Sequence, residues 1–158
     1  MKKALLLLLF FVSGQAIAQN NPITSITISL PANPDASLAN GAELSEANVM
    51  DAINFRWTPV IPKPRDPITY RVRVWQLMQG QNGTQALKAS QPIFTKDVDN
   101  LTQLVVNKLI ISPCAPPNSC SFIWNVQALN RDGKPIGTNN GTSGDFSFSV
   151  KPSRQTPR

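Results

Sequence analysis

Short segments of alternating apolar and polar residues, separated by prolines, limit this chain to a β-rich fold. Its 158 residues include 14 prolines and 14 asparagines, and both residue types disfavour the interior of a helix. A helical bundle is therefore excluded. The clearest alternation runs from residue 68 to residue 75. One face carries Ile68, Tyr70, Val72 and Val74, and the other carries Thr69, Arg71, Arg73 and Trp75. A period of two residues is typical of a strand with one buried face.

Further strands are predicted wherever the same alternation recurs. They cover residues 24–30, 53–57, 101–111, 122–129 and 146–150, with short or edge strands at 85–90 and 92–98. Residues 43–52 allow one or two helical turns, although their apolar residues form no clean stripe. About seven short strands separated by turn signals predict an all-β fold, a sandwich of two antiparallel sheets.

The first 18 residues have the pattern of a secretory signal peptide. Lys2 and Lys3 precede the apolar run 4–12, and Ala16 and Ala18 form the small-residue site read by a signal peptidase. Cleavage before Gln19 predicts export to the periplasm or the cell surface of a bacterium. No other stretch approaches the roughly 20 apolar residues of a membrane span, so no transmembrane anchor is expected.

The remainder of the chain is long enough for one domain, which we place at residues 19–150. The segment 151–158 is basic and rich in proline and polar residues, which predicts a disordered tail. Without Lys2 and Lys3 the net charge falls from +6 to +4, and no basic stripe is present. Nucleic acid is therefore not expected as a partner.

Cys114 and Cys120 are the two cysteines, and they enclose a proline-rich turn. In an exported chain, a pair this close is expected to form a disulfide. A loop this short contributes at most about 2 kcal/mol to stability. A catalytic redox pair normally has a two-residue spacer, and zinc would need two further ligands. The chain has no histidine to supply them, so no metal or cofactor is expected.

The absence of histidine also argues against an enzyme. It removes the nucleophile systems that pair serine or cysteine with histidine. Three acids cluster in one segment, at Glu43, Glu46 and Asp51. Paired glycosidase carboxylates must face each other across a cleft, whereas acids in a single surface segment are normally solvated. The chain is therefore predicted to be non-enzymatic.

Four segments of alternating aromatic and aliphatic residues carry a resemblance to a known family. They are FRWTPV, YRVRVW, SFIWNVQALNRDGKP and FSFSV. They look like strands B, C, F and G of a fibronectin type III-like module of exported bacterial surface proteins, and the resemblance covers residues 23–150. It implies a role in adhesion, recognition or spacing. Phe122 departs from the pattern, because such modules usually place there a tyrosine whose hydroxyl restrains the preceding corner. We suggest that the link between Cys114 and Cys120, which lies in the same corner, replaces the restraint that the tyrosine hydroxyl provides.

The alternation divides the tryptophans between the core and the surface. Trp57 and Trp124 share the parity of buried positions and are predicted to pack between the sheets. Arg71, Arg73 and Trp75 should point outward. In the fibronectin-like topology they lie beside the outward residues Asn125 and Gln127 of the neighbouring strand. This patch of guanidinium groups, an indole and amides can bind a ligand. The alternative is an ordinary surface ladder in which arginine stems cover Trp75.

Two functions follow for such a patch. The first is a non-enzymatic recognition or assembly module that binds another cell-envelope protein. The alternative is a carbohydrate-binding module for a surface glycan, which requires an exposed, flat Trp75 indole beside Asn125 and Gln127. If Trp75 belongs to the core, the loop 130–144 becomes the preferred site, because loops of that length are either functional or mobile.

Overall fold

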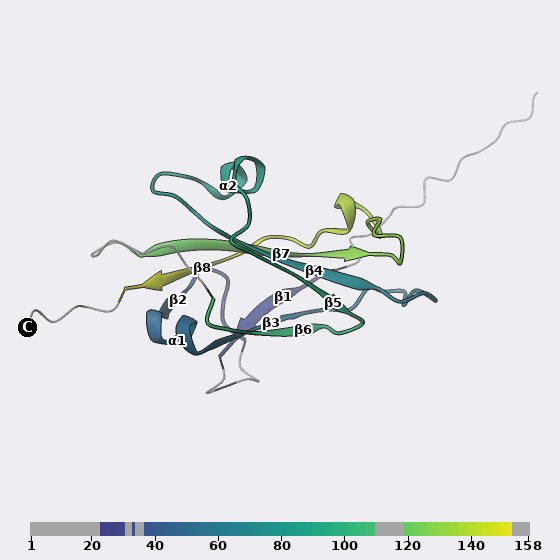
Figure 1. Ribbon diagram of the computed structural model, residues 1–158, viewed down its shortest axis with the longest axis horizontal. Coiled ribbons are helices and arrows are strands. Elements are labelled where there is room, and N and C mark those ends of the chain that lie inside the picture. Colours follow the sequence, from purple (N-terminus) through teal and green to yellow (C-terminus); the bar gives the residue numbers. More distant parts are fainter. Residues whose placement is uncertain (1–22, 31–32, 34–36, 110–118, 153–158) are drawn as a thin grey trace, which may run out of the picture.

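The computed structural model describes residues 23–30, 33, 37–109 and 119–152 as two β-sheets packed face to face (Figure 1). The smaller sheet has the order β1-β3-β6, with β1 at Ile26–Ser29, β3 at Ala52–Trp57 and β6 at Gln103–Asn107. The larger sheet has the order β2-β8-β7-β4-β5. Its strands are β2 (Ala42–Ser45), β8 (Phe146–Lys151), β7 (Cys120–Leu129), β4 (Thr69–Gln76) and β5 (Phe94–Asp99). The predicted all-β sandwich is confirmed, with eight strands in place of about seven.

The prediction of purely antiparallel sheets was wrong for one pair of strands. β2 runs parallel to β8, with Ala42 opposite Phe148, while every other pair in the two sheets is antiparallel. The reason lies in the path of the chain. β1 belongs to the smaller sheet, and the chain then crosses to the larger sheet. There β2 forms the edge strand beside β8 and runs in the same direction as β8.

Aromatic side chains fill the space between the sheets. Trp124 is fully buried, and its ring meets Phe55 edge to face with centroids 4.8 Å apart. Phe122 stacks on Phe148 at 5.0 Å, and Trp57 packs against Tyr70 at 5.5 Å. The predicted core positions of Trp57 and Trp124 are therefore confirmed.

Two short helices begin at capping boxes. In α1 (Glu46–Asp51), the side chain of Ser45 accepts a hydrogen bond from the backbone of Asn48. The predicted helical turns within 43–52 are thus present, but the residues before Glu46 form β2. In α2 (Gly83–Ala89), Asn82 and Gln85 cap each other reciprocally.

The strand predicted at 85–90 was wrong, because these residues form most of α2. A capping box satisfies otherwise unpaired backbone donors and favours a helix start. α2 lies on the outer face of the larger sheet, the face turned away from the smaller sheet (Figure 1). A Cβ atom at Gly83 would overlap the side chain of Ile123 on β7, so the helix packs directly on the strands.

Several predictions fall on parts of the chain outside the described residues. These are the signal peptide at 1–18, Cys114, and the tail from 153 onward. Cys120 is not a free thiol, but its predicted link to Cys114 stays a prediction. Lys151, the first residue of the predicted tail, is the last residue of β8, and its Nζ lies 3.5 Å from Oε1 of Glu43. Within the described ranges, no helix has the length and apolar character needed to cross a membrane.

Candidate functional site

Two adjoining cavities form a groove on the outer face of the larger sheet. One, of about 680 Å³, is lined by residues of β4, of β5 and of the α2 segment. The other, of about 330 Å³, extends toward the loop 139–145. Arg73, Trp75 and Leu87 line both cavities, so we treat them as one site and call it the outer groove. α2 and the loop between β7 and β8 lie on this same side of the sheet (Figure 1).

Trp75 lies on the predicted face of β4, but the prediction that its indole is exposed was wrong. Its side chain is only 4% exposed, because α2 and the residues after it cover it. The indole Nε1 donates a hydrogen bond to the carbonyl oxygen of Ser90 at 3.2 Å, and Ala86 in α2 is fully buried. Trp75 therefore belongs to a small second core between the sheet and α2. The loop 130–144, the site preferred for a buried Trp75, lines the second cavity of the groove with residues 139, 140 and 142–144.

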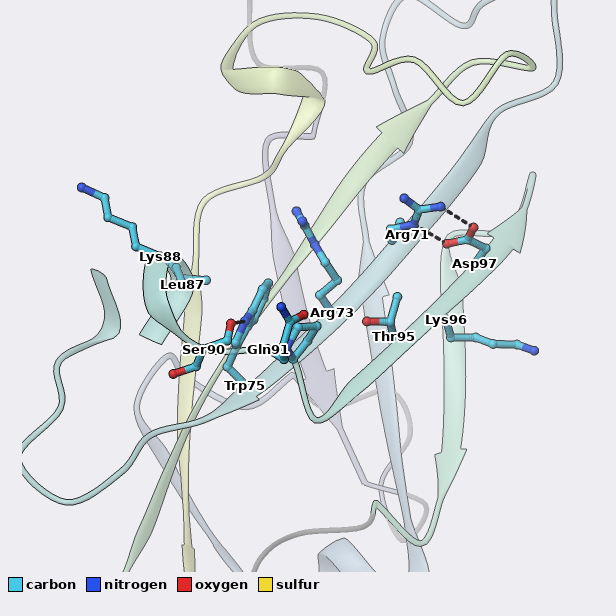
Figure 2. Close-up of a pocket in the computed structure, with 11 residues that line it drawn as sticks. Arg71, Arg73, Trp75, Leu87, Lys88, Ser90, Gln91, Thr95, Lys96 and Asp97 are labelled. Atoms are coloured by element: carbon cyan, nitrogen blue, oxygen red, sulfur yellow. Dashed lines mark hydrogen bonds and ion pairs between the residues drawn. The ribbon is translucent and has the colours of Figure 1, made fainter. Parts of the chain in front are cut away.

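Arg71 is held by a bidentate ion pair across two neighbouring strands. Its Nε and Nη2 lie 2.8 Å and 2.9 Å from the two carboxylate oxygens of Asp97 on β5 (Figure 2). The hydrogen bonds that Arg71 donates to Asp97 raise the pKa of Arg71. The same bonds from Arg71 lower the pKa of Asp97. The charge of Arg71 is thus already balanced within the protein.

This ion pair predicts a loss of stability in acid. The pKa of Asp97 is lower in the folded than in the unfolded protein, so the stabilisation is complete above the ordinary aspartate pKa of about 3.9 and is lost as the pH falls through the folded value. Because both side chains are about 40% exposed, we expect less than about 1 kcal/mol. Chemical denaturation of wild type and Asp97→Asn should show a difference at pH 7 that disappears near pH 2. A difference independent of pH would contradict this prediction.

Arg73 has no such partner. Its Nε is buried without a hydrogen bond, and it makes no ion pair with the described residues. The guanidinium carbon lies 5.4 Å from the centre of the Trp75 ring. Desolvation by burial lowers the pKa of Arg73, the charge of Arg71 lowers it further, and Asp145 partly opposes both. Figure 2 shows its side chain lying between α2 and Arg71.

The two amides of the predicted patch are engaged by the loop before β8. Asn125 is 3% exposed, and its Nδ2 donates to Asp145 at 3.0 Å. Gln127 donates from Nε2 to the carbonyl oxygen of Asn140 at 2.8 Å. The prediction that both amides are surface contacts was therefore wrong for Asn125. The loop folds back along β7 and uses both amides as anchors.

Sequence reasoning missed most of the walls of the groove. Leu87 and Ser90 come from a segment read as a strand, although the capping pair Asn82 and Gln85 was a readable signal for a helix. Asn139 and Asn140 adopt positive φ angles of 52° and 51°, which asparagine tolerates better than most residues. The paired asparagines in a long loop were the signal for this tight turn.

The described residues contain no cluster of metal-ligating side chains. Within these ranges no three histidine, cysteine, aspartate or glutamate side chains gather into a site that could hold a metal ion. The groove brings together arginine, indole, amide and hydroxyl groups. Such groups can bind a ligand by charge and hydrogen bonding.

No protein-family model matches this chain, and no curated protein matches it. Among solved structures, the chain is similar to the soluble domain of PmoD from Methylocystis sp. ATCC 49242 (Rockwell), with 14% sequence identity and a TM-score of 0.42. The match covers 79% of this chain and 88% of that one. A similarity at this level carries no argument about a ligand, a partner or an activity.

Proposed function

We propose that the protein is an exported, non-enzymatic recognition module of the fibronectin type III-like kind, which binds another cell-envelope protein through the outer groove. The observation that carries this proposal is Arg73, a charged side chain with a buried and unpaired Nε at the floor of an open groove. A buried N–H group without a hydrogen-bond acceptor is costly. A ligand in the groove would supply the missing partner.

A purely structural role explains Arg73 less well. Its guanidinium carbon lies 5.4 Å from the centre of the Trp75 ring, but this cation-π contact leaves the hydrogen-bond donors of the guanidinium unused. Arg71, two residues earlier on the same face, has a carboxylate from the neighbouring strand. The described part of the protein provides no carboxylate of this kind for Arg73.

The order of the strands supports the predicted resemblance to a fibronectin type III-like module. The segments compared with strands B, C, F and G are β3, β4, β7 and β8, and the last three lie side by side in the larger sheet. Modules of that family serve adhesion, recognition or spacing, and the resemblance is therefore compatible with a binding role for the outer groove.

A glycan is the weaker alternative. Stacking a sugar ring requires an exposed aromatic face, and the indole of Trp75 is 4% exposed. The groove presents a guanidinium group in its place. This favours a charged protein segment as the ligand.

Site-specific photocrosslinking in cells tests the proposal. A diazirine amino acid at Thr95, an exposed residue of the groove, should yield an adduct with one envelope protein. The same probe at Val105, which is 55% exposed on β6 of the other sheet, is the matched control and should not. Mass spectrometry identifies the adduct. Carbohydrate adducts would support the glycan alternative, and equal adducts from both positions, or none, would contradict the proposal.

A further inference from the structure

We infer that Arg73 is the receptor for a carboxylate group of an acidic segment of the protein partner. This inference rests on the proposed function and specifies the chemistry of the same groove.

Three polar side chains around Arg73 donate hydrogen bonds within the protein. Arg71 donates to Asp97, Asn125 Nδ2 donates to Asp145, and the Trp75 indole donates to Ser90. Arg73 makes no hydrogen bond or ion pair to the described residues, and the buried Oδ1 of Asn125 also has no hydrogen-bond partner. The Arg73 guanidinium is therefore a donor at the centre of the groove that a ligand can satisfy.

The shape of a guanidinium group selects a carboxylate. Its planar fork donates two parallel hydrogen bonds, which match the two oxygens of a carboxylate. The Trp75 ring beneath Arg73 restricts the orientation of the fork. Lys88 and Lys96 line the groove, but Figure 2 shows both pointing away from Arg73. One free guanidinium beside Asp145 suits a singly charged anion better than a phosphate.

Charge and apolar contacts both favour an acidic protein segment. Four cationic side chains line the groove, namely Arg71, Arg73, Lys88 and Lys96, against the two acids Asp97 and Asp145. This net positive balance attracts acidic chains. Leu87 and Pro92 add apolar surface beside Arg73, where aliphatic neighbours of the acidic residue can pack. An extended segment carrying glutamate or aspartate between aliphatic residues fits both features.

Nuclear magnetic resonance of the exported full chain, labelled with nitrogen-15, tests the inference. The probe is the capped tripeptide acetyl-Leu-Glu-Leu-amide, and the control probe has glutamine in place of glutamate. We expect the Nε–H resonance of Arg73 to shift saturably with the glutamate peptide. Binding of the glutamine peptide should be weaker by about tenfold, because the charge-assisted bonds are lost. Equal binding of the two peptides would overturn the inference.

Two variants distinguish binding by the Arg73 guanidinium from attraction to the overall positive charge of the protein. Arg73→Met removes the guanidinium and its contact with the Trp75 ring, and it should abolish binding of the glutamate peptide in a protein that circular dichroism shows to be folded. Lys63→Gln removes the same charge beside a different cavity, lined by Ile68 and Tyr70, and should bind as wild type does. Loss of binding in both variants would point to net charge alone and overturn the role of Arg73. Tighter binding of methyl glucuronide than of the peptide would assign the site to acidic glycans and overturn the choice of a protein segment.

The two proposals can fail separately. If the Thr95 crosslink to an envelope protein persists in Arg73→Met, the carboxylate inference is wrong and the recognition function stands. If Arg73 binds the glutamate peptide but no envelope protein is crosslinked, the site chemistry is right and the proposed partner is wrong.

Discussion

Replacing Trp124 with alanine should lower the free energy of unfolding by about 3 to 5 kcal/mol. The indole is fully buried between the two sheets, where it contacts Phe55 at 4.8 Å and Phe146 at 5.8 Å. These rings come from both sheets and from strands far apart in the sequence, so they cannot close the cavity without shifting the sheets. Urea denaturation measures the loss directly.

The control for Trp124 is Val105→Ala on the exposed side of β6. Val105 is 55% exposed, and a surface truncation there should change stability by less than about 0.5 kcal/mol. A Trp124→Ala protein as stable as the Val105→Ala protein would contradict the packing of the two sheets around this indole.

Trp75→Ala should be the second most destabilising change, at about 2 to 3 kcal/mol. The indole is buried beneath α2, and its removal also leaves the carbonyl of Ser90 without its donor. The loss should be smaller than for Trp124, because a helix of two turns can settle into the space more easily than a sheet can. Denaturation measures the stability, and hydrogen exchange should show faster opening of Ala86 and its neighbours in α2.

Trp75→Phe is the matched control, because it keeps an aromatic ring under α2 and removes the Nε1 donor. It should retain most of the stability lost in Trp75→Ala. If Trp75→Ala changed the free energy of unfolding by less than about 0.5 kcal/mol, as an exposed residue does, the indole would be free at the surface and α2 would not cover it.

The alternation of residues predicted the strands because each strand has one face in a shared core. Ile68 and Tyr70 are buried, and Arg71 and Arg73 lie on the opposite face, as a period of two requires. The same reasoning placed Trp124 in the core and Trp75 on the outer face. The local sequence pattern is sufficient to assign each residue to the inner or the outer face, because the direction of a side chain in a strand depends only on its position in the strand.

The exposure of the outer face could not be predicted in the same way. Trp75 and Asn125 point outward, but segments distant from them in the chain cover both, namely α2 and the loop 139–145. Alternation reports which face a side chain occupies and carries no information on what packs against that face. The helix α2 was also misread, since seven residues are too few for periods of 2 and 3.6 to be separated.

The ion pair of Arg71 shows why the sequence alone could not predict which arginine is available to a ligand. In sequence, Arg71 and Arg73 are equivalent basic residues on one face of a strand. Asp97 lies opposite Arg71 in the register of β4 and β5, while Thr95 lies opposite Arg73. The register therefore neutralises one arginine and leaves its neighbour available, a distinction that depends on how distant strands align.

The affinity of the crosslinked envelope protein for wild type and for Arg73→Met is the most direct test of the outer groove as the contact surface. Calorimetry with purified proteins gives the two dissociation constants, and circular dichroism verifies equal folding. If the outer groove is the contact surface, Arg73→Met should bind at least about tenfold more weakly than wild type, because one charge-assisted contact is lost. Lys63→Gln should bind as wild type does. Equal dissociation constants for wild type and Arg73→Met would contradict the central role of Arg73 in the outer groove.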